Sequence, residues 1–151
     1  MFKKVPIKVI LDTNLFVASY FNPYSYSSII IDWCLENKIK NCITKDTFNE
    51  LEFILKKIRA TLVYKKKIYN LMEKSILVKP GKVFLIEDDL ADNKFLALAD
   101  KSRADYLITN DYHLLKLKKF KQTRILKPTE FYHLIKNKIR THESKGKKEK
   151  K

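Results

Sequence analysis

Val9-Ile10-Leu11-Asp12-Thr13-Asn14 is the stretch of sequence that decides the fold. The continuous apolar run predicts a strand from Ile7 to Leu11 that is buried on both faces, as strands of parallel sheets are. Asp12 follows this strand directly, so its carboxylate is expected at the strand's C-terminal end. Ligands of open α/β sheets bind at that edge, which makes Asp12 the first candidate for a functional side chain.

Predicted strands and helices alternate along the rest of the chain. Two glycines and four prolines in 151 residues predict long elements with short connections. Further strands are expected at residues 41–43, 83–86, 106–109 and 124–126, and helices at 25–37, 45–57, 62–74, 92–101 and after Pro128. This alternation predicts a three-layer α/β/α sandwich with a mostly parallel central sheet.

Acidic residues recur at the predicted ends of these elements: Glu50, the group Asp88, Asp89 and Asp92, and Asp111. Magnesium and manganese prefer oxygen ligands, so carboxylates gathered at one sheet edge favour a hard-metal site. Each acid also has a simpler interpretation. Asp92 is a favoured type of helix cap, Glu50 fits a solvated helix position, and Asn110-Asp111 fits an ordinary turn.

The chain resembles the PIN-domain family, specifically the toxins of type II toxin–antitoxin systems (VapC-like ribonucleases), in five short pieces that follow one another in the family's order. The resemblance runs from about Lys8 to about Ile135. The pieces are Val9-Ile10-Leu11-Asp12-Thr13-Asn14, Thr44-Lys45-Asp46-Thr47-Phe48 with Glu50-Leu51, Asp92-Asn93-Lys94-Phe95-Leu96-Ala97-Leu98-Ala99, Ala104-Asp105-Tyr106-Leu107-Ile108-Thr109-Asn110-Asp111, and Ile125-Leu126-Lys127-Pro128-Thr129-Glu130-Phe131. Asn110 departs from the pattern, since this subgroup usually places Gly before the final Asp.

The resemblance implies a metal-dependent endoribonuclease that hydrolyses RNA phosphodiester bonds with Mg²⁺ or Mn²⁺. Its catalytic and metal-binding residues would be Asp12, Glu50, Asp92 and Asp111. Asn14 and Thr109 would support them. The resemblance also implies a homodimer and a cognate antitoxin protein, and it leaves open whether one or two ions act.

Two other classes with an Asp after the first strand fit less well. A phosphatase of the haloacid dehalogenase type needs a second Asp where Asn14 stands. A response-regulator receiver domain needs an acidic pair after its first strand and a late Lys, and that arrangement is absent from the sequence. A noncatalytic PIN-like module that binds RNA or an antitoxin, and a housekeeping RNA-processing nuclease, remain as alternatives.

The formal net charge of +15 and the pI of about 9.7 favour a polyanionic partner. The region 62–74 interleaves basic and aromatic side chains, and it is either a solvated helix face or an RNA-binding surface that combines phosphate contact with base stacking. The RNA-binding candidates there are Tyr64, Lys65, Lys66, Lys67 and Tyr69.

Residues 137–151 carry seven basic side chains against two acidic ones, which predicts a disordered basic tail behind a nuclease domain at 1–136. The tail is either a solvating segment or an arm that binds nucleic acid or a partner, and both can hold together. No apolar run approaches the length that spans a bilayer. Cys34 and Cys42 are too few for a disulfide framework and fit a reducing compartment. The sequence therefore predicts a cytoplasmic protein without a membrane segment.

Overall fold

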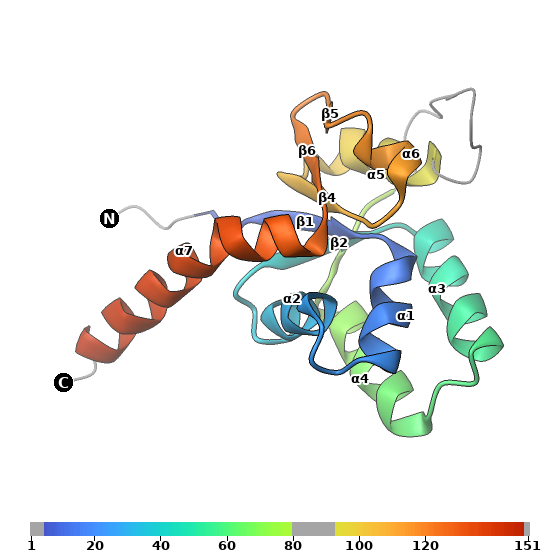
Figure 1. Ribbon diagram of the computed structural model, residues 1–151, viewed down its shortest axis with the longest axis horizontal. Helices are drawn as coiled ribbons and strands as arrows, with labels where there is room; N and C mark the ends of the chain where they lie inside the picture. Colours follow the sequence, from blue (N-terminus) through green and yellow to red (C-terminus); the bar gives the residue numbers. More distant parts are fainter. Residues whose placement is uncertain (1–4, 80–92, 150–151) are drawn as a thin grey trace.

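A single six-stranded sheet forms the centre of the molecule (Figure 1). The computed structural model describes residues 5–79 and 93–149, with Asn93 and residues 140–149 described by their backbone only. The strand order is β3-β2-β1-β4-β6-β5. The strands are β1 (Lys8–Leu11), β2 (Lys40–Ile43), β3 (Ile76–Leu77), β4 (Tyr106–Ile108), β5 (Lys119–Phe120) and β6 (Thr123–Leu126). Each pairing is parallel except that of β5 with β6.

Helices cover both faces of the sheet. They are α1 (Thr13–Phe21), α2 (Tyr26–Leu35), α3 (Lys45–Lys57), α4 (Leu62–Lys74), α5 (Asn93–Ser102), α6 (Tyr112–Leu115) and α7 (Pro128–Glu149). Buried side chains of α1, α2, α3, α4 and α7 share one hydrophobic core, and those of α5 and α6 share the other. The predicted three-layer α/β/α sandwich with a mostly parallel sheet is therefore confirmed.

The central strands are buried because their side chains alternate between these two cores. Val9 and Leu11 belong to the core of the five helices, whereas Ile10 between them packs with α5 and α6. Leu107 and Ile108 divide between the cores in the same way. A strand without a solvent-facing side shows no polar alternation, which explains the continuous apolar runs of the sequence.

The strand order reverses direction between β1 and β4. From β1 the chain first builds outward through β2 and β3, and it then returns to place β4 and β6 on the other side of β1. Ligand-binding crevices of open α/β sheets form at such a reversal, outside the carboxyl ends of the strands. We call this place the carboxyl edge. It is reached by the residues that follow β1, β4 and β6, namely Asp12, Thr109 and Lys127.

Short polar motifs fix the ends of α3. At its start, Thr44 and Thr47 form a capping box, with Thr47 N donating to Thr44 Oγ1 over 3.2 Å. At its end, Arg59 has a φ of 54°, and Ala60 N donates to Leu55 O over 3.0 Å. This is a Schellman termination built on a residue other than Gly. The predicted helix at 45–57 is confirmed at both ends.

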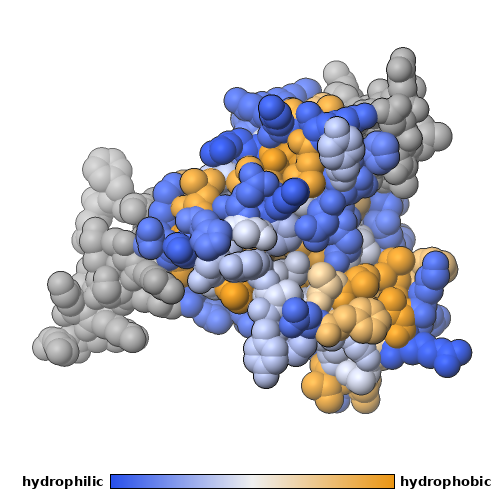
Figure 2. Space-filling view, in the orientation of Figure 1, coloured by the Kyte–Doolittle hydropathy of each residue, from blue (hydrophilic) through white to orange (hydrophobic). Residues whose placement is uncertain are grey.

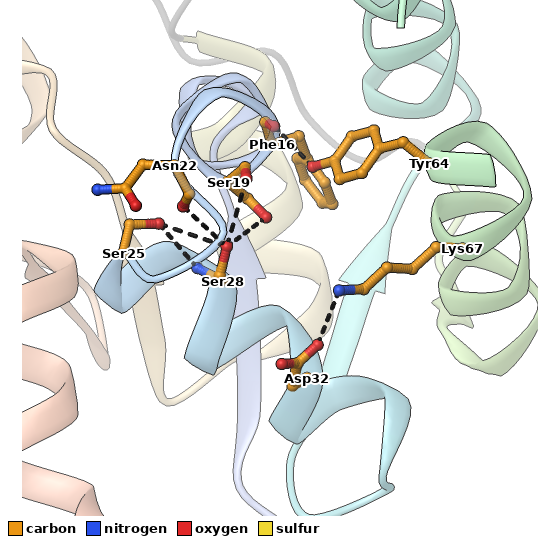
Figure 3. A network of polar contacts seen from close by, with 8 residues as sticks. All are labelled: Phe16, Ser19, Asn22, Ser25, Ser28, Asp32, Tyr64 and Lys67. Atoms are coloured by element: carbon orange, nitrogen blue, oxygen red, sulfur yellow. Dashed lines mark hydrogen bonds and ion pairs between the residues drawn. The ribbon is translucent and has the colours of Figure 1, made fainter. Parts of the chain in front are cut away.

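A network of hydroxyl groups and one ion pair joins α1, α2 and α4 (Figure 3). Ser19 and Ser28 are buried and lie 2.7 Å apart through their Oγ atoms, which ties α1 to α2. Lys67 of α4 pairs with Asp32 of α2 at 2.9 Å. Buried hydroxyl groups cost free energy unless they are hydrogen-bonded. Contacts of this kind therefore hold the helix layer beneath the carboxyl edge in one arrangement.

Two parts of the fold differ from the sequence prediction. Residues 13–21 form α1, which was not predicted. Residues 137–149, predicted to be a disordered tail, continue the helix of α7 as far as Glu149. Lys and Glu are good helix formers, and Pro128 starts the helix in its first turn, so the backbone continues as a helix beyond the buried residue Ile139.

The predicted strand at 83–86 and the acids Asp88, Asp89 and Asp92 lie outside the described residues. Within the described residues, no helix is long and apolar enough to cross a membrane.

Candidate active site at the carboxyl edge

Asp12 lies at the centre of the carboxyl edge, between β1 and α1. It is the N-cap residue of α1, and no capping hydrogen bond of good geometry reaches its carboxylate, although the nearby backbone N–H of Asn14 lowers the pKa of the carboxyl group. Thr109 Oγ1 donates to Asp12 Oδ2 over 2.6 Å, and Asn14 Nδ2 donates to the same oxygen over 3.2 Å. Asp12 is only 7% exposed. A carboxylate that caps a helix faces the first helical N–H groups, whereas this one is held toward the neighbouring strand.

The loop after β4 brings the second candidate segment to Asp12. Asp12 N donates to Ile108 O over 3.0 Å, which aligns the ends of the two strands. Thr109 is fully buried, and its Oγ1 also accepts from Asp111 N at 2.9 Å. Asp111 is the N-cap residue of α6, and its Oδ1 accepts from His113 N at 2.9 Å. Thr109 therefore links Asp12 to Asp111, whose side chain has a structural role as a cap.

Glu50 reaches the same region from α3. Thr13 Oγ1 donates to Glu50 Oε2 over 2.9 Å, and Lys94 Nζ forms an ion pair with the same oxygen at 2.8 Å. The side chains of Lys94 and Glu50 are 25% and 30% exposed. Glu50 thus belongs to the site, and its described contacts tie α3 to the starts of α1 and α5.

Lys94 is a site residue that the sequence analysis missed. It stands in the first turn of α5, where the helix dipole disfavours a positive charge. The carboxylate of Glu50 offsets that cost. A basic residue in the first turn of a predicted helix, two positions after a candidate acid, was the available signal.

Burial is the main influence on the Asp12 carboxyl group. Desolvation raises its pKa above 3.8, the negative charges of Glu50 and Asp111 raise it further, and the hydrogen bond from Thr109 opposes them. The three acids are therefore close enough to interact. A carboxylate held in such surroundings is stabilised by a nearby cation.

We expect Asp12→Asn to be more stable than the wild type near pH 7 in EDTA. Because the pKa of Asp12 is raised in the folded state, the folded protein holds its proton more tightly, and stability falls as pH rises above 3.8 through the folded pKa. Asn carries no such cost. The difference in free energy of unfolding between the two proteins should therefore shrink as pH is lowered toward 3.8. Urea unfolding of both proteins between about pH 4 and pH 7 measures this difference. If Asp12→Asn is less stable than the wild type at pH 7, the prediction is wrong.

The donor set suits a hard cation. The side chains at the site offer carboxylate, hydroxyl and amide oxygens, which Mg²⁺ and Mn²⁺ prefer. Asn14 Oδ1 is buried and, among the described residues, has no hydrogen-bond partner. The described residues contain no group of three or more His, Cys, Asp or Glu side chains arranged to hold a metal ion. Asp92, the fourth predicted acid, lies outside the described residues.

Some of the predicted RNA-binding side chains of α4 contact neighbouring helices. Tyr64 OH donates to Phe16 O over 2.7 Å, and burial raises the pKa of Tyr64 to about 12 (Figure 3). Lys67 pairs with Asp32. Tyr69 is 41% exposed, and its ring centroid lies 6.3 Å from that of Phe48. Contact of Tyr64, Lys65, Lys66, Lys67 and Tyr69 with RNA stays a prediction.

Comparisons with known proteins identify the family of this fold and site. A family model described as the PIN domain matches residues 8–113. The chain belongs to the PIN-domain family, whose members are generally nucleases. An uncharacterised protein of Methanocaldococcus jannaschii is 31% identical over 122 residues, which span 77% of this chain and 78% of that protein.

Two solved structures share the fold at low sequence identity. PAE2754 from Pyrobaculum aerophilum has a TM-score of 0.57 at 12% identity, covering 87% of this chain and 90% of that one. VapBC2 from Rickettsia felis, crystallised with a DNA fragment from its promoter, has a TM-score of 0.56 at 14% identity, covering 80% of this chain and 98% of the matched one. Identities this low support the fold alone.

Proposed function

We propose that the protein is a metal-dependent endoribonuclease and the toxin of a toxin–antitoxin pair. The observation that carries the proposal is the orientation of Asp12. Its buried carboxylate lies at the reversal of strand order, and Thr109 and Asn14 fix Oδ2 although a helix N-terminus follows directly. Holding a carboxylate in this way suits a site that binds a cation against a phosphate.

Asp12 is the central ligand in this proposal, and Glu50, Asp92 and Asp111 are the further acids of the site. Mg²⁺ or Mn²⁺, when bound, polarises the scissile phosphate and lowers the pKa of a coordinated water. Thr109 and Asn14 keep the Asp12 carboxylate oriented, which limits the reorganisation needed during the reaction. Thr13 and Lys94 do the same for Glu50.

An exposed apolar area supports the proposed protein partners. Four large side chains at the end of α1, on α3 and at the start of α4 are between 65% and 80% exposed, namely Phe21, Phe53, Leu62 and Val63. Figure 2 shows hydrophobic side chains over this part of the molecule. Exposed apolar areas often mark protein interfaces. A cognate antitoxin and a second copy of the chain are the proposed partners, and the cytoplasm is the proposed compartment.

A noncatalytic RNA-binding or antitoxin-binding module is the second candidate function. It is favoured by the ion pair of Glu50 with Lys94 and by the cap that Asp111 forms on α6, because both acids have structural partners. A housekeeping RNA-processing nuclease would share the chemistry of the first candidate and differ in its target.

The assay that separates these candidates is cleavage of single-stranded RNA by the purified protein. We expect cleavage with Mg²⁺ or Mn²⁺ and none in EDTA, because the ion would act as the Lewis acid on the scissile phosphate and lower the pKa of the attacking water. Binding of the same RNA should persist in EDTA. Binding without cleavage under every metal condition would favour the noncatalytic module.

A further inference from the structure

The segment from α6 to the end of β6 is one of two strongly basic described parts of the body, the other being the region from the end of α3 into α4. Residues 112–129 contain six Lys and Arg side chains and no Asp or Glu. We call these six residues the basic hairpin: Lys116, Lys118, Lys119, Lys121, Arg124 and Lys127. All six are exposed, and Figure 2 shows hydrophilic side chains, with hydrophobic ones between them, over the β5–β6 part of this face.

The segment that carries the basic hairpin begins and ends at the candidate active site. Asp111 caps α6 at its start. At its end, β6 lies parallel to β4 with Leu126 beside Ile108, and Thr109 N donates to Leu126 O over 3.0 Å. Lys127 therefore follows β6 at the same carboxyl edge as Thr109. The strand β6 is four residues long, so the cations extend roughly 10–13 Å away from that edge.

Two like charges face each other within the basic hairpin. Lys119 and Arg124 are direct neighbours in the antiparallel pairing of β5 with β6. Like charges at directly opposed positions are destabilising. The printed contacts of the described carboxylates nearby do not include Lys119 or Arg124: Asp100 pairs with Lys121 of the basic hairpin at 2.6 Å, Glu130 accepts from Lys127 N, and Asp105 accepts from Lys8 N. The fold thus retains a repulsion that an external anion would relieve.

Protection of the sheet edge explains only part of this pattern. Lysines on an edge strand discourage pairing with other chains, and β5 is an edge strand. Arg124, however, lies in β6, which is paired on both sides, and Lys127 lies beyond the strand. These two cations have no edge to protect.

We propose that the basic hairpin holds the sugar-phosphate backbone of RNA on one side of the scissile bond. The proposal rests on the proposed function, because the basic hairpin borders that site. Phosphate contacts of this kind position a nucleic acid without reading its sequence. The occupant is RNA rather than an acidic protein segment because the cations lead directly from the carboxyl edge.

The test is the charge reversal Lys119→Glu in the full-length protein. It turns the opposed pair with Arg124 into an attractive one, so the melting temperature should rise by roughly 1–4 °C. The Kd for a single-stranded RNA oligonucleotide in EDTA should rise about tenfold, and the salt dependence of binding should flatten by about 0.7 in slope per lost phosphate contact. A residue with a purely structural role would not combine higher stability with weaker binding.

The matched control is Lys57→Glu, which makes the same change in net charge at the exposed end of α3, away from the basic hairpin (Figure 1). It should leave the Kd within about twofold of wild type. Equal weakening by both substitutions would assign the effect to net charge and overturn the proposal, as would unchanged binding by Lys119→Glu. A polyglutamate peptide is the probe for an acidic partner. If it binds as tightly as the RNA, and its affinity falls equally in Lys119→Glu, the surface would instead be assigned to an acidic protein segment.

These measurements are made in EDTA, without cleavage. A protein that binds through the basic hairpin but never cleaves RNA would sink the nuclease proposal and leave this one standing. If the protein cleaves RNA but Lys119→Glu binds RNA with the wild-type Kd, the nuclease proposal stands and the proposal for the basic hairpin is wrong.

Discussion

Asp12→Asn should reduce RNA cleavage by roughly 100-fold or more at saturating Mg²⁺, because the lost negative charge weakens both ion binding and water activation. The substituted amide can still accept the hydrogen bond from Thr109, so the local fold is expected to persist. RNA affinity measured in EDTA should change little. Single-turnover cleavage of a labelled oligonucleotide measures the first effect, and fluorescence anisotropy measures the second.

The matched control for this loss is Glu36→Gln. Glu36 is an exposed acid at the end of α2 that pairs with Lys38, and exposed ion pairs contribute little to stability. It should cleave RNA like the wild type. Equal cleavage by wild type and Asp12→Asn would remove Asp12 from the chemistry and leave it as a structural residue of the carboxyl edge.

Phe131→Ala should lower the free energy of unfolding by about 3–5 kcal/mol, the usual cost of removing a large aromatic side chain from a core. Phe131 is fully buried in α7. Its ring centroid lies 6.3 Å from that of Trp33 on α2 and 5.2 Å from that of Tyr106 at the start of β4. The substitution therefore leaves a cavity where α7 joins the sheet and α2.

Leu134→Ala on the same helix is the control, since Leu134 is 40% exposed and its removal opens no buried cavity. Urea unfolding of the three proteins measures both differences. If the two substitutions cost the same free energy, Phe131 does not anchor α7 in the way its contacts indicate.

Most of the sheet could be predicted because its strands are buried on both faces. Val9-Ile10-Leu11 and Tyr106-Leu107-Ile108 have no polar alternation, and each is followed by a residue of the carboxyl edge. The lack of a polar side also explains why α1 was not predicted. Its sequence Thr13–Phe21 is apolar on nearly every side, so no helical stripe distinguishes it from a strand or a buried loop. The two-residue strands β3 and β5 are too short to leave any periodic signal.

The candidate site was only partly accessible to sequence reasoning. Acids at element ends indicated Asp12, Glu50 and Asp111, and the structure brings all three to the carboxyl edge, close enough for Glu50 and Asp111 to raise the pKa of Asp12. The pairing of Glu50 with Lys94 and Thr13 depends on how α3 packs against α1 and α5. Tertiary packing of that kind has no local signature. Likewise, a run of lysines does not reveal which one faces another cation across a hairpin, as Lys119 faces Arg124.

The hydrogen bond between Asp12 and Thr109 joins residues 97 positions apart, and this separation has a consequence during protein synthesis. A ribosome adding 5–20 residues per second needs roughly 5–20 s to pass from the first of these residues to the second. Throughout that interval the nascent chain carries Asp12 without the strand that orients it. A growing chain therefore cannot assemble the site before Thr109 has been added, and the proposed cleavage of RNA would begin only after β4 and β6 have emerged and paired.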